Sequence, residues 1–307
     1  MFSPMNILMI AVAGLILAAL AASPSDGAPT SPIEAGEQLT QLPGEFSFTE
    51  GPASDTNGDV YFTDQPNDKI LRWSAADGKI ATWMEPCGRS NGLCFDSKGN
   101  LWACADNENE LWRIDRNKNV TKVVTAYEGK LLNGPNDVWI RPKDAGVYVT
   151  DPMYKRDYWK RDPAEQALKG VYYLPAGGKA LTLLVSDLKQ PNGIIGTPDG
   201  KTLYVSDIND GKTYAYDIAH DGALSNRRLF CSMGSDGMTI DSEGSVYLTG
   251  HGVTVFSKDG AQIAHIPVSE DWTGNVCFGG KDKRTLFITA SKHVYTIRMR
   301  VHGVGSQ

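Results

Sequence analysis

Six side chains that carry oxygen atoms recur at one position of a sixfold repeat. Five of them stand eight residues before the glycine or lysine of a polar turn, and the sixth, Asn136, stands ten residues before Gly146. The six residues are Glu50, Asn91, Asn136, Asn192, Asp236 and Asn275. A repeat that closes into a ring would bring them together. Carboxylate and amide oxygens are the ligands that hard divalent cations prefer.

The chemistry expected of this set is metal-assisted catalysis. The carboxylates of Glu50 and Asp236, with the amide oxygens of Asn136 and Asn192, would neutralise a divalent cation. We expect Ca²⁺, with Zn²⁺, Mn²⁺ or Mg²⁺ as substitutes, because no clustered His or Cys favours a softer metal. Open positions on such an ion take water and substrate, where the ion polarises a carbonyl group and stabilises an oxyanion.

A structural role is the alternative for each of these residues. Asn and Asp at strand starts often bond to nearby backbone and carry no function. Local capping does not require one phase in all six repeats, so the shared phase favours a site. Asn91 is expected to face substrate or a bound water. Asn275 is the member for which the structural role is favoured.

The repeats themselves predict the elements that position these residues. Successive turns are 41, 47, 54, 44 and 39 residues apart, a spacing typical of propeller blades of about 40–50 residues. Short apolar and aromatic runs alternate with Asp-Gly, Asn-Gly and Lys-Gly turns, as strands do. We therefore predict an all-β fold, a six-bladed β-propeller over residues 37–299, with a metal site at one mouth of its central channel. The segment Gln38–Phe48 is expected to complete the last blade.

The remainder of the 307-residue chain indicates export. Residues 6–22 are almost wholly apolar, and the small residues Ala19 and Ala21 fit a cleavage pattern. We expect a signal peptide over residues 1–22, a disordered lead over 23–36 and a C-terminal tail over 300–307. The protein would be secreted or periplasmic; the alternative is a membrane anchor formed by residues 6–22.

Charge and cysteine content narrow the partners. A net charge of −6 excludes a nucleic-acid partner, which needs a basic surface. We expect a small-molecule substrate, no membrane contact after cleavage, and a monomer or weak oligomer.

Five cysteines leave at least one thiol free. After export, a Cys87–Cys94 or a Cys94–Cys104 disulfide could form, and the sequence does not decide between these pairings and free thiols.

Five short motifs give the chain a family resemblance. They are TEGP (Thr49–Pro52), NGPNDV (Asn133–Val138), TDPMY (Thr150–Tyr154), QPNGI (Gln190–Ile194) and SDGM (Ser235–Met238). In this order and spacing, over residues 42–298, the chain resembles the SMP-30/gluconolactonase/luciferin-regenerating-like family of calcium propellers, in its bacterial gluconolactonase-like branch.

The resemblance implies one calcium ion held by Glu50, Asn136, Asn192 and Asp236. It also implies a hydrolase that opens a sugar lactone or another cyclic ester by attack of water on a metal-polarised carbonyl, with Asp236 as catalytic base. Two rival functions keep the metal. One is hydrolysis of organophosphate or other esters, and the other is a non-catalytic, calcium-stabilised binding propeller.

Several further residues are candidates for substrate binding. Some family members carry a substrate-contacting Arg where Gly134 stands here, and Arg89 is a substitute from the neighbouring blade. The insertion Tyr154–Lys169 offers stacking faces at Tyr154, Tyr158 and Trp159, and Arg156 or Arg161 to hold a carboxylate. His251, between two glycines, is a base candidate and otherwise a turn residue. Surface roles are the alternatives for Arg89 and for the insertion.

Overall fold

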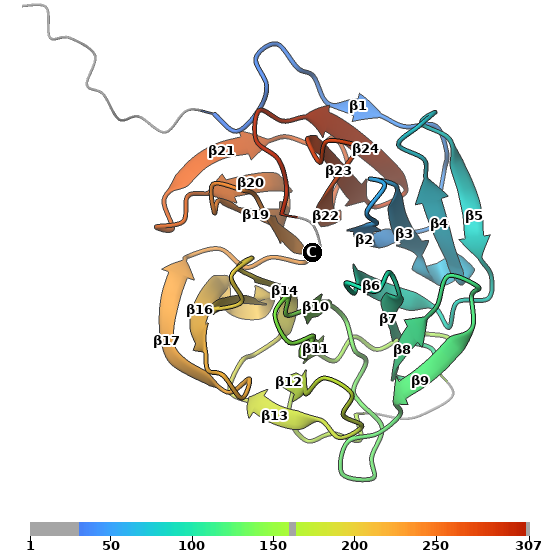
Figure 1. The fold of residues 1–307 in the computed structure, drawn as a ribbon, viewed down its shortest axis with the longest axis vertical. Helices are drawn as coiled ribbons and strands as arrows, with labels where there is room; N and C mark the ends of the chain where they lie inside the picture. The colour runs from blue at the N-terminus through green and yellow to red at the C-terminus, as the bar shows by residue number, and fades with distance from the viewer. Residues whose placement is uncertain (1–30, 160–163, 305–307) are drawn as a thin grey trace, which may run out of the picture. The chain divides into compact units, whose positions relative to one another are not determined.

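The computed structural model describes residues 31–159 and 164–304, which belong to one compact unit. Six antiparallel sheets of four strands each surround a common axis (Figure 1). Apart from the strands, the regular elements among the described residues are two short 3-10 turns, η1 (Gln65–Asn67) and η2 (Ile208–Asp210). This confirms the predicted all-β, six-bladed propeller.

Each of the first three blades is formed by four consecutive strands. Blade 1 contains β2 (Thr49–Ser54), β3 (Val60–Asp64), β4 (Lys69–Trp73) and β5 (Ile80–Met84). Blade 2 contains β6 (Ser90–Phe95), β7 (Leu101–Ala105), β8 (Glu110–Ile114) and β9 (Val120–Val124). Blade 3 contains β10 (Val138–Ile140), β11 (Val147–Asp151), β12 (Gly170–Leu174) and β13 (Thr182–Val185).

The last three blades repeat this order, except at the point where the ring closes. Blade 4 contains β14 (Pro191–Gly196), β15 (Thr202–Asp207), β16 (Lys212–Ile218) and β17 (Leu224–Cys231). Blade 5 contains β18 (Met238–Ile240), β19 (Val246–Gly250), β20 (Gly252–Phe256) and β21 (Gln262–Ile266). Blade 6 contains β22 (Thr273–Gly279), β23 (Thr285–Ala290), β24 (His293–Arg298) and the N-terminal strand β1 (Thr40–Gln41).

The ring is closed by the N-terminal segment. Thr40 of β1 pairs with Thr296 of β24, and Gln41 pairs with Tyr295. The expected contribution of Gln38–Phe48 to the last blade is therefore confirmed. Pairing the first strand with the last blade leaves no gap in the ring through which a blade could separate.

The hydrophobic core lies between neighbouring sheets. The second strand of each blade is buried almost throughout, because it is covered on both faces, and its sequence is correspondingly apolar, as in β7 (LWACA). Ring contacts join adjacent blades: the centroids of Phe62 and Phe287 are 5.4 Å apart, and those of Tyr61 and Phe95 are 5.1 Å apart. The outer strand β17, by contrast, is mostly exposed.

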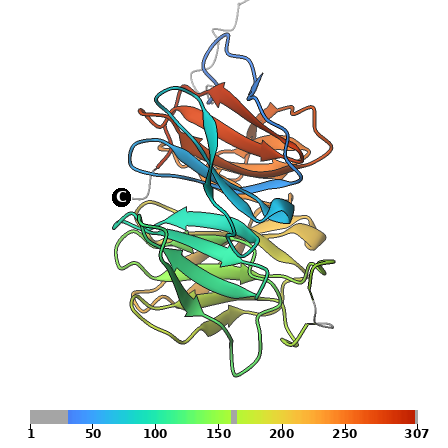
Figure 2. The same ribbon diagram turned by 90° about the vertical axis from the view of Figure 1, so that its right-hand side faces the viewer.

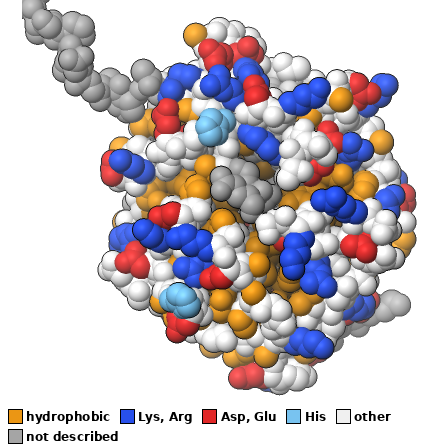
Figure 3. Space-filling view, in the orientation of Figure 1, with side chains coloured by type: hydrophobic (Ala, Val, Ile, Leu, Met, Phe, Trp, Pro, Cys, Tyr) orange, Lys and Arg blue, Asp and Glu red, His pale blue; other side chains and the backbone are white. Residues whose placement is uncertain are grey.

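The two faces of the ring differ. In the side view, η1, η2 and residues 152–159, which follow β11, project from the same face (Figure 2). The opposite face, in view in Figure 3, has charged side chains toward its rim and hydrophobic side chains visible between the blades.

Candidate metal and active site at one mouth of the channel

The six oxygen residues lie at the starts of the six innermost strands. These strands, β2, β6, β10, β14, β18 and β22, each form the axial edge of a sheet (Figure 1). Glu50, Asn91, Asn192 and Asn275 lie within the first three residues of their strands, and Asn136 and Asp236 stand two residues before β10 and β18. The inner strands run in the same direction, so their starts share one mouth of the channel.

Buried aspartates fix the backbone just before these residues. Asp64 accepts the N–H groups of Ser47 and Phe48, two residues before Glu50. Two equivalent aspartates do the same in blades 3 and 4: Asp151 accepts from Asn133 and Gly134, and Asp207 accepts from Lys189 and Gln190. Each aspartate ends the second strand of its blade, so the repeat itself positions Glu50, Asn136 and Asn192.

Glycines beside the oxygen residues allow the inner strands to approach closely. A Cβ atom on Gly237, which follows Asp236, would lie 1.9 Å from Cγ of Asn275 in the next blade. A Cβ on Gly274 would lie 2.7 Å from Oε1 of Glu50. No side chain fits at either position. The two contacts link blade 5 to blade 6 and blade 6 to blade 1, which brings Asp236, Asn275 and Glu50 around one point.

Both acidic members of the set have raised pKa values. Glu50 is buried, with 3% of its surface exposed, and Oε2 accepts the N–H of Gly51 at 2.9 Å. Burial, and then the negative charge of Asp236, hold the pKa of Glu50 well above its usual value. Burial also raises the pKa of Asp236 to about 6, although hydrogen bonds from Trp272 and Asn192 oppose the rise. Two carboxylates enclosed together in this way gain stability from a bound cation.

Asn192 supplies the observation that best fits a cation. Its Nδ2 donates to Oδ1 of Asp236 at 2.8 Å and to the hydroxyl of Tyr154 at 2.9 Å. Its Oδ1 is buried and has no hydrogen-bond partner within the described part of the chain, and the same holds for Oδ1 of Asn91. A buried carbonyl oxygen without a partner is costly unless something else binds it. The metal set Glu50, Asn136, Asn192 and Asp236 therefore suits a hard divalent cation.

Amide oxygens are essential to this interpretation. Among residues 31–159 and 164–304, no group of three or more His, Cys, Asp or Glu side chains is arranged to hold a metal. The site has two carboxylates only, and the remaining ligands must be carboxamides and water. This composition favours calcium over zinc or copper.

The sequence did not identify Trp272, which contacts Asp236 directly. Its Nε1 donates to Oδ2 of Asp236 at 2.6 Å. Trp272 lies in the loop before β22, three residues ahead of Asn275, and this position is the only sequence signal that it had. The ring of His251 is exposed and packs edge-on against Trp272, with centroids 5.5 Å apart. His251 thus lies next to a residue that contacts Asp236.

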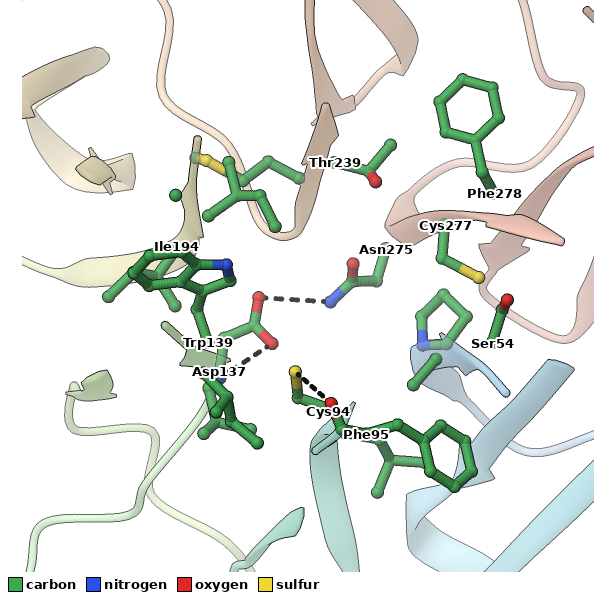
Figure 4. A pocket seen from close by; sticks show the side chains of 18 of the residues that line it. Ser54, Cys94, Phe95, Asp137, Trp139, Ile194, Thr239, Asn275, Cys277 and Phe278 are labelled. Atoms are coloured by element: carbon green, nitrogen blue, oxygen red, sulfur yellow. Dashed lines mark hydrogen bonds between the residues drawn. The ribbon is translucent and has the colours of Figure 1, made fainter. Parts of the chain in front are cut away.

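Behind the metal set, a carboxyl–amide pair crosses the channel. Nδ2 of Asn275 donates to Oδ2 of Asp137 at 3.5 Å, and the two side chains point toward one another (Figure 4). They line a cavity of about 130 Å³ formed by the later residues of the inner strands. Burial raises the pKa of Asp137 to about 8. The Asn275 side chain also opposes the rise in the pKa of Glu50, so this amide lies between the metal set and Asp137.

The segment Tyr154–Trp159, hereafter the rim segment, crosses from blade 3 to Asp106 at the end of β7. The hydroxyl of Tyr158 donates to Oδ2 of Asp106, and Nε1 of Trp159 donates to the backbone oxygen of Asp106 at 2.8 Å. The guanidinium of Arg89 covers one face of Tyr158, with Cζ 4.4 Å from the ring centroid. The structure thus brings these proposed substrate residues together. Arg161 lies outside the described residues.

The five cysteines are free thiols. Neither the Cys87–Cys94 nor the Cys94–Cys104 disulfide, which the sequence allows, is formed. Cys87, Cys104, Cys231 and Cys277 are buried and Cys94 is partly buried. Burial raises the pKa of Cys87, Cys94 and Cys277 to about 12, so these thiols are core residues rather than nucleophiles.

Comparison with known proteins agrees with this architecture. Residues 48–292 match the family model described as the SMP-30/Gluconolactonase/LRE-like region. A gluconolactonase from Zymomonas mobilis is 28% identical over 304 residues, covering 88% of this chain and 84% of that protein. A gluconolactonase structure from Xanthomonas campestris superimposes with a TM-score of 0.80 and 29% identity, over 87% of this chain and 91% of that one.

A more distant structure shows the same fold. The calcium-binding protein regucalcin from Agrobacterium tumefaciens has a TM-score of 0.71 and 19% identity, over 86% of this chain and 96% of that one. At this identity the likeness concerns the fold alone. The family model, in contrast, spans most of the chain, from the first inner strand to the last blade. The chain therefore belongs to the SMP-30/gluconolactonase/LRE-like family.

Proposed function

We propose that this protein is a calcium-dependent hydrolase that opens a sugar lactone. The observation that carries the proposal is the unpartnered, buried Oδ1 of Asn192 beside two enclosed carboxylates. Relatives named gluconolactonase, which cover most of this chain, support the cyclic-ester substrate. Burial raises the pKa values of Glu50 and Asp236 while hydrogen bonds oppose the rise, and carboxyl groups perturbed in this way are typical of functional sites.

The cation would be held by Glu50, Asn136, Asn192 and Asp236. When bound, it supplies Lewis acidity that polarises a lactone carbonyl and stabilises the developing oxyanion. The protein's contribution is to hold the ligands in place. Asp64, Asp151 and Asp207 fix the backbone that carries three of them, and Tyr154 orients the amide of Asn192 so that Oδ1 faces away from the hydroxyl.

Asp236 is the proposed general base. Water attacks the lactone carbonyl carbon and its proton passes to a carboxylate oxygen of Asp236. The ring C–O bond then breaks, and Asp236 returns the proton to the departing ring oxygen, which gives the hydroxy acid and restores the carboxylate. Trp272 and Asn192 donate to the two oxygens of Asp236 and keep the carboxylate in one orientation. Such positioning places the base without further reorganisation.

The chain outside the propeller is proposed to serve export. The signal peptide over residues 1–22 and most of the lead over 23–36 lie outside the described residues. In the part of the chain that the structure describes, no helix is long and apolar enough to cross a membrane. The proposed propeller domain is residues 37–299, followed by a tail over 300–307. We propose that the protein binds a small-molecule substrate and is a monomer or a weak oligomer.

A substrate panel tests the proposal. Purified protein is assayed on gluconolactone, other aldonolactones and a phosphotriester, with Ca²⁺ or with EDTA, after subtraction of the uncatalysed rate. Calcium-dependent turnover of a lactone is expected. Turnover of the phosphotriester alone would favour the organophosphate function. Calcium binding without turnover of any of these substrates would favour a binding propeller.

A further inference from the structure

We propose that Arg156 is a specificity-determining residue that binds an anionic group on the substrate, such as a carboxylate, and that Asp106 positions it. The substrate class would then be lactones of acidic sugars. This inference rests on the proposed lactonase function and adds the chemistry of the substituent remote from the reacting carbonyl.

Asp106 has a different role from the equivalent aspartates of other blades. Asp64, Asp151 and Asp207 end the second strands of blades 1, 3 and 4 and accept backbone N–H groups from the loop that leads into their own inner strand. In blade 2 that role belongs to Asp68, whose Oδ1 accepts the N–H groups of Cys87 and Arg89. Asp106 occupies the same position of the repeat as these aspartates, but the loop that leads into the inner strand of its blade is held by Asp68.

Asp106 instead collects side chains from other blades. It is 2% exposed, and its Oδ2 accepts from Nε2 of Gln65 at 3.2 Å, from Nε of Arg156 at 3.0 Å and from the hydroxyl of Tyr158. Gln65 belongs to η1 of blade 1, whereas Arg156 and Tyr158 belong to the rim segment of blade 3. A buried carboxylate that joins three blades fixes the rim segment in one arrangement.

This arrangement leaves the two terminal nitrogens of Arg156 available to a ligand. Its Nε bonds to Asp106, whereas its two terminal nitrogens have no hydrogen bond to the described residues. The side chain is 24% exposed. Its Cζ lies 5.6 Å from the ring centroid of Tyr154, whose hydroxyl bonds to Asn192 of the metal set. A planar edge with two parallel N–H donors therefore stands next to the site, and this edge is the shape that binds a carboxylate bidentately.

Two guanidinium groups lie close to the rim segment. Arg89 covers the ring of Tyr158, and Arg156 shares the carboxylate of Asp106 with the Tyr158 hydroxyl. The exposed neighbours Lys155 and Asp157 cancel each other. A charge-assisted, bidentate bond to the free edge of Arg156 is open to an anionic lactone and not to a neutral one.

The test compares two lactones that differ in one charge. Steady-state kcat/KM is measured for a neutral aldonolactone and for the monolactone of an aldaric acid, which carries a free carboxylate. Arg156→Gln is expected to lower kcat/KM for the acidic lactone by about 10- to 100-fold, the usual effect of losing a charge-assisted hydrogen bond. For the neutral lactone the change should stay within about twofold. Arg156→Lys should fall between, because it keeps the charge and loses the fork.

Lys155→Gln is the matched control. It removes the same charge from the adjacent, exposed position of the rim segment. It should leave kcat/KM unchanged for both lactones. Asp106→Asn should reduce the preference for the acidic lactone as Arg156→Gln does, since the guanidinium is then no longer held. Equal losses on both lactones in Arg156→Gln, or the same loss in Lys155→Gln, would overturn the inference.

Direct binding separates this inference from the proposed function. Calorimetry in Ca²⁺ compares an open-chain aldarate with a neutral alditol of the same length. Tighter binding of the aldarate that disappears in Arg156→Gln supports the anion site even if no lactone is hydrolysed. If the protein hydrolyses a neutral lactone but Arg156→Gln does not change aldarate binding, the proposed lactonase function is supported and the anion site is refuted.

Discussion

Nε1 of Trp272 donates to Oδ2 of Asp236 at 2.6 Å, while Oδ1 of the same carboxylate accepts from Asn192 at 2.8 Å. The two donors come from different blades: Trp272 precedes β22 of blade 6 and Asn192 lies in β14 of blade 4. Asp236 stands between them at the start of blade 5. The orientation of the proposed base is therefore set by both neighbouring blades.

Removing the indole donor should impair catalysis more than folding. We expect Trp272→Phe to lower kcat for lactone hydrolysis by about tenfold, since one hydrogen bond to a charged group contributes about 1.5–3 kcal/mol. The ring that packs against His251 is retained. Trp83→Phe, in the outer strand β5, is the control and should leave kcat unchanged. A full rate in Trp272→Phe would show that the contact with Asp236 has no catalytic consequence.

Loss of the Asn192 amide should weaken metal binding. Asn192→Ala removes the unpartnered Oδ1 together with a donor to Asp236. We expect calcium affinity, measured by calorimetry, to fall by about 10- to 100-fold, because one of few protein ligands is lost. Asn100→Ala, in a turn of blade 2, is the matched control. Equal calcium affinity in Asn192→Ala and the unaltered protein would exclude Asn192 from the metal set.

The stability of the metal-free protein should fall as pH rises. The native pKa values of Glu50, Asp236 and Asp137 are raised, to about 6 for Asp236 and about 8 for Asp137, whereas unfolded Asp and Glu titrate near pH 4. Between about pH 4 and pH 8 the native state binds more protons than the unfolded state, so its stability decreases with pH.

Urea unfolding in EDTA checks this expectation. The midpoint should be lower at pH 8 than at pH 5.5, and Asp137→Asn should reduce the difference. Calcium competes with protons for Glu50 and Asp236, so its affinity should increase over the same range and restore stability at pH 8. A metal-free midpoint that is independent of pH would mean that these carboxyls do not carry the assigned protons.

Close packing of the inner strands should make Gly237 intolerant of substitution. Gly237→Ala places a methyl group against the Asn275 side chain, and we expect a destabilisation of about 1–3 kcal/mol or more, measured by urea unfolding in Ca²⁺. Gly211→Ala is the control, because its Cβ would meet nothing within 4 Å. It should cost about 1 kcal/mol through its positive φ alone. Similar costs at both positions would contradict the close approach of blades 5 and 6.

Export predicts a specific mature terminus. Expression of the full chain in a secretion-competent host should yield protein whose mass begins after Ala21 or Ala22. Recovery of the intact chain in the membrane fraction would instead indicate an anchor formed by residues 6–22. The propeller should bind calcium equally well in either form.

The fold and the ring of oxygen residues could be predicted because both repeat. Glu50, Asn136 and Asn192 follow fixed positions in their blades, and the repeat places them at one mouth before any contact is known. Trp272 and Asp106 could not be assigned in this way. Trp272 lies three residues before Asn275, and no other blade has a tryptophan at that distance before its oxygen residue. Asp106 shares the position of Asp64 and Asp151, but its partners come from other blades, through Gln65 and the rim segment. Pairings between blades depend on three-dimensional closure and leave no periodic signal.

The central claim is that one calcium ion on the metal set supports lactone hydrolysis. The most direct measurement is a calcium titration of EDTA-treated protein in which binding and gluconolactone hydrolysis are followed together, for the unaltered protein and for Asp236→Asn. We predict one bound ion per chain, hydrolysis that rises in proportion to occupancy, and loss of hydrolysis in Asp236→Asn. Hydrolysis that persists without calcium, or a full rate in calcium-loaded Asp236→Asn, would contradict the account.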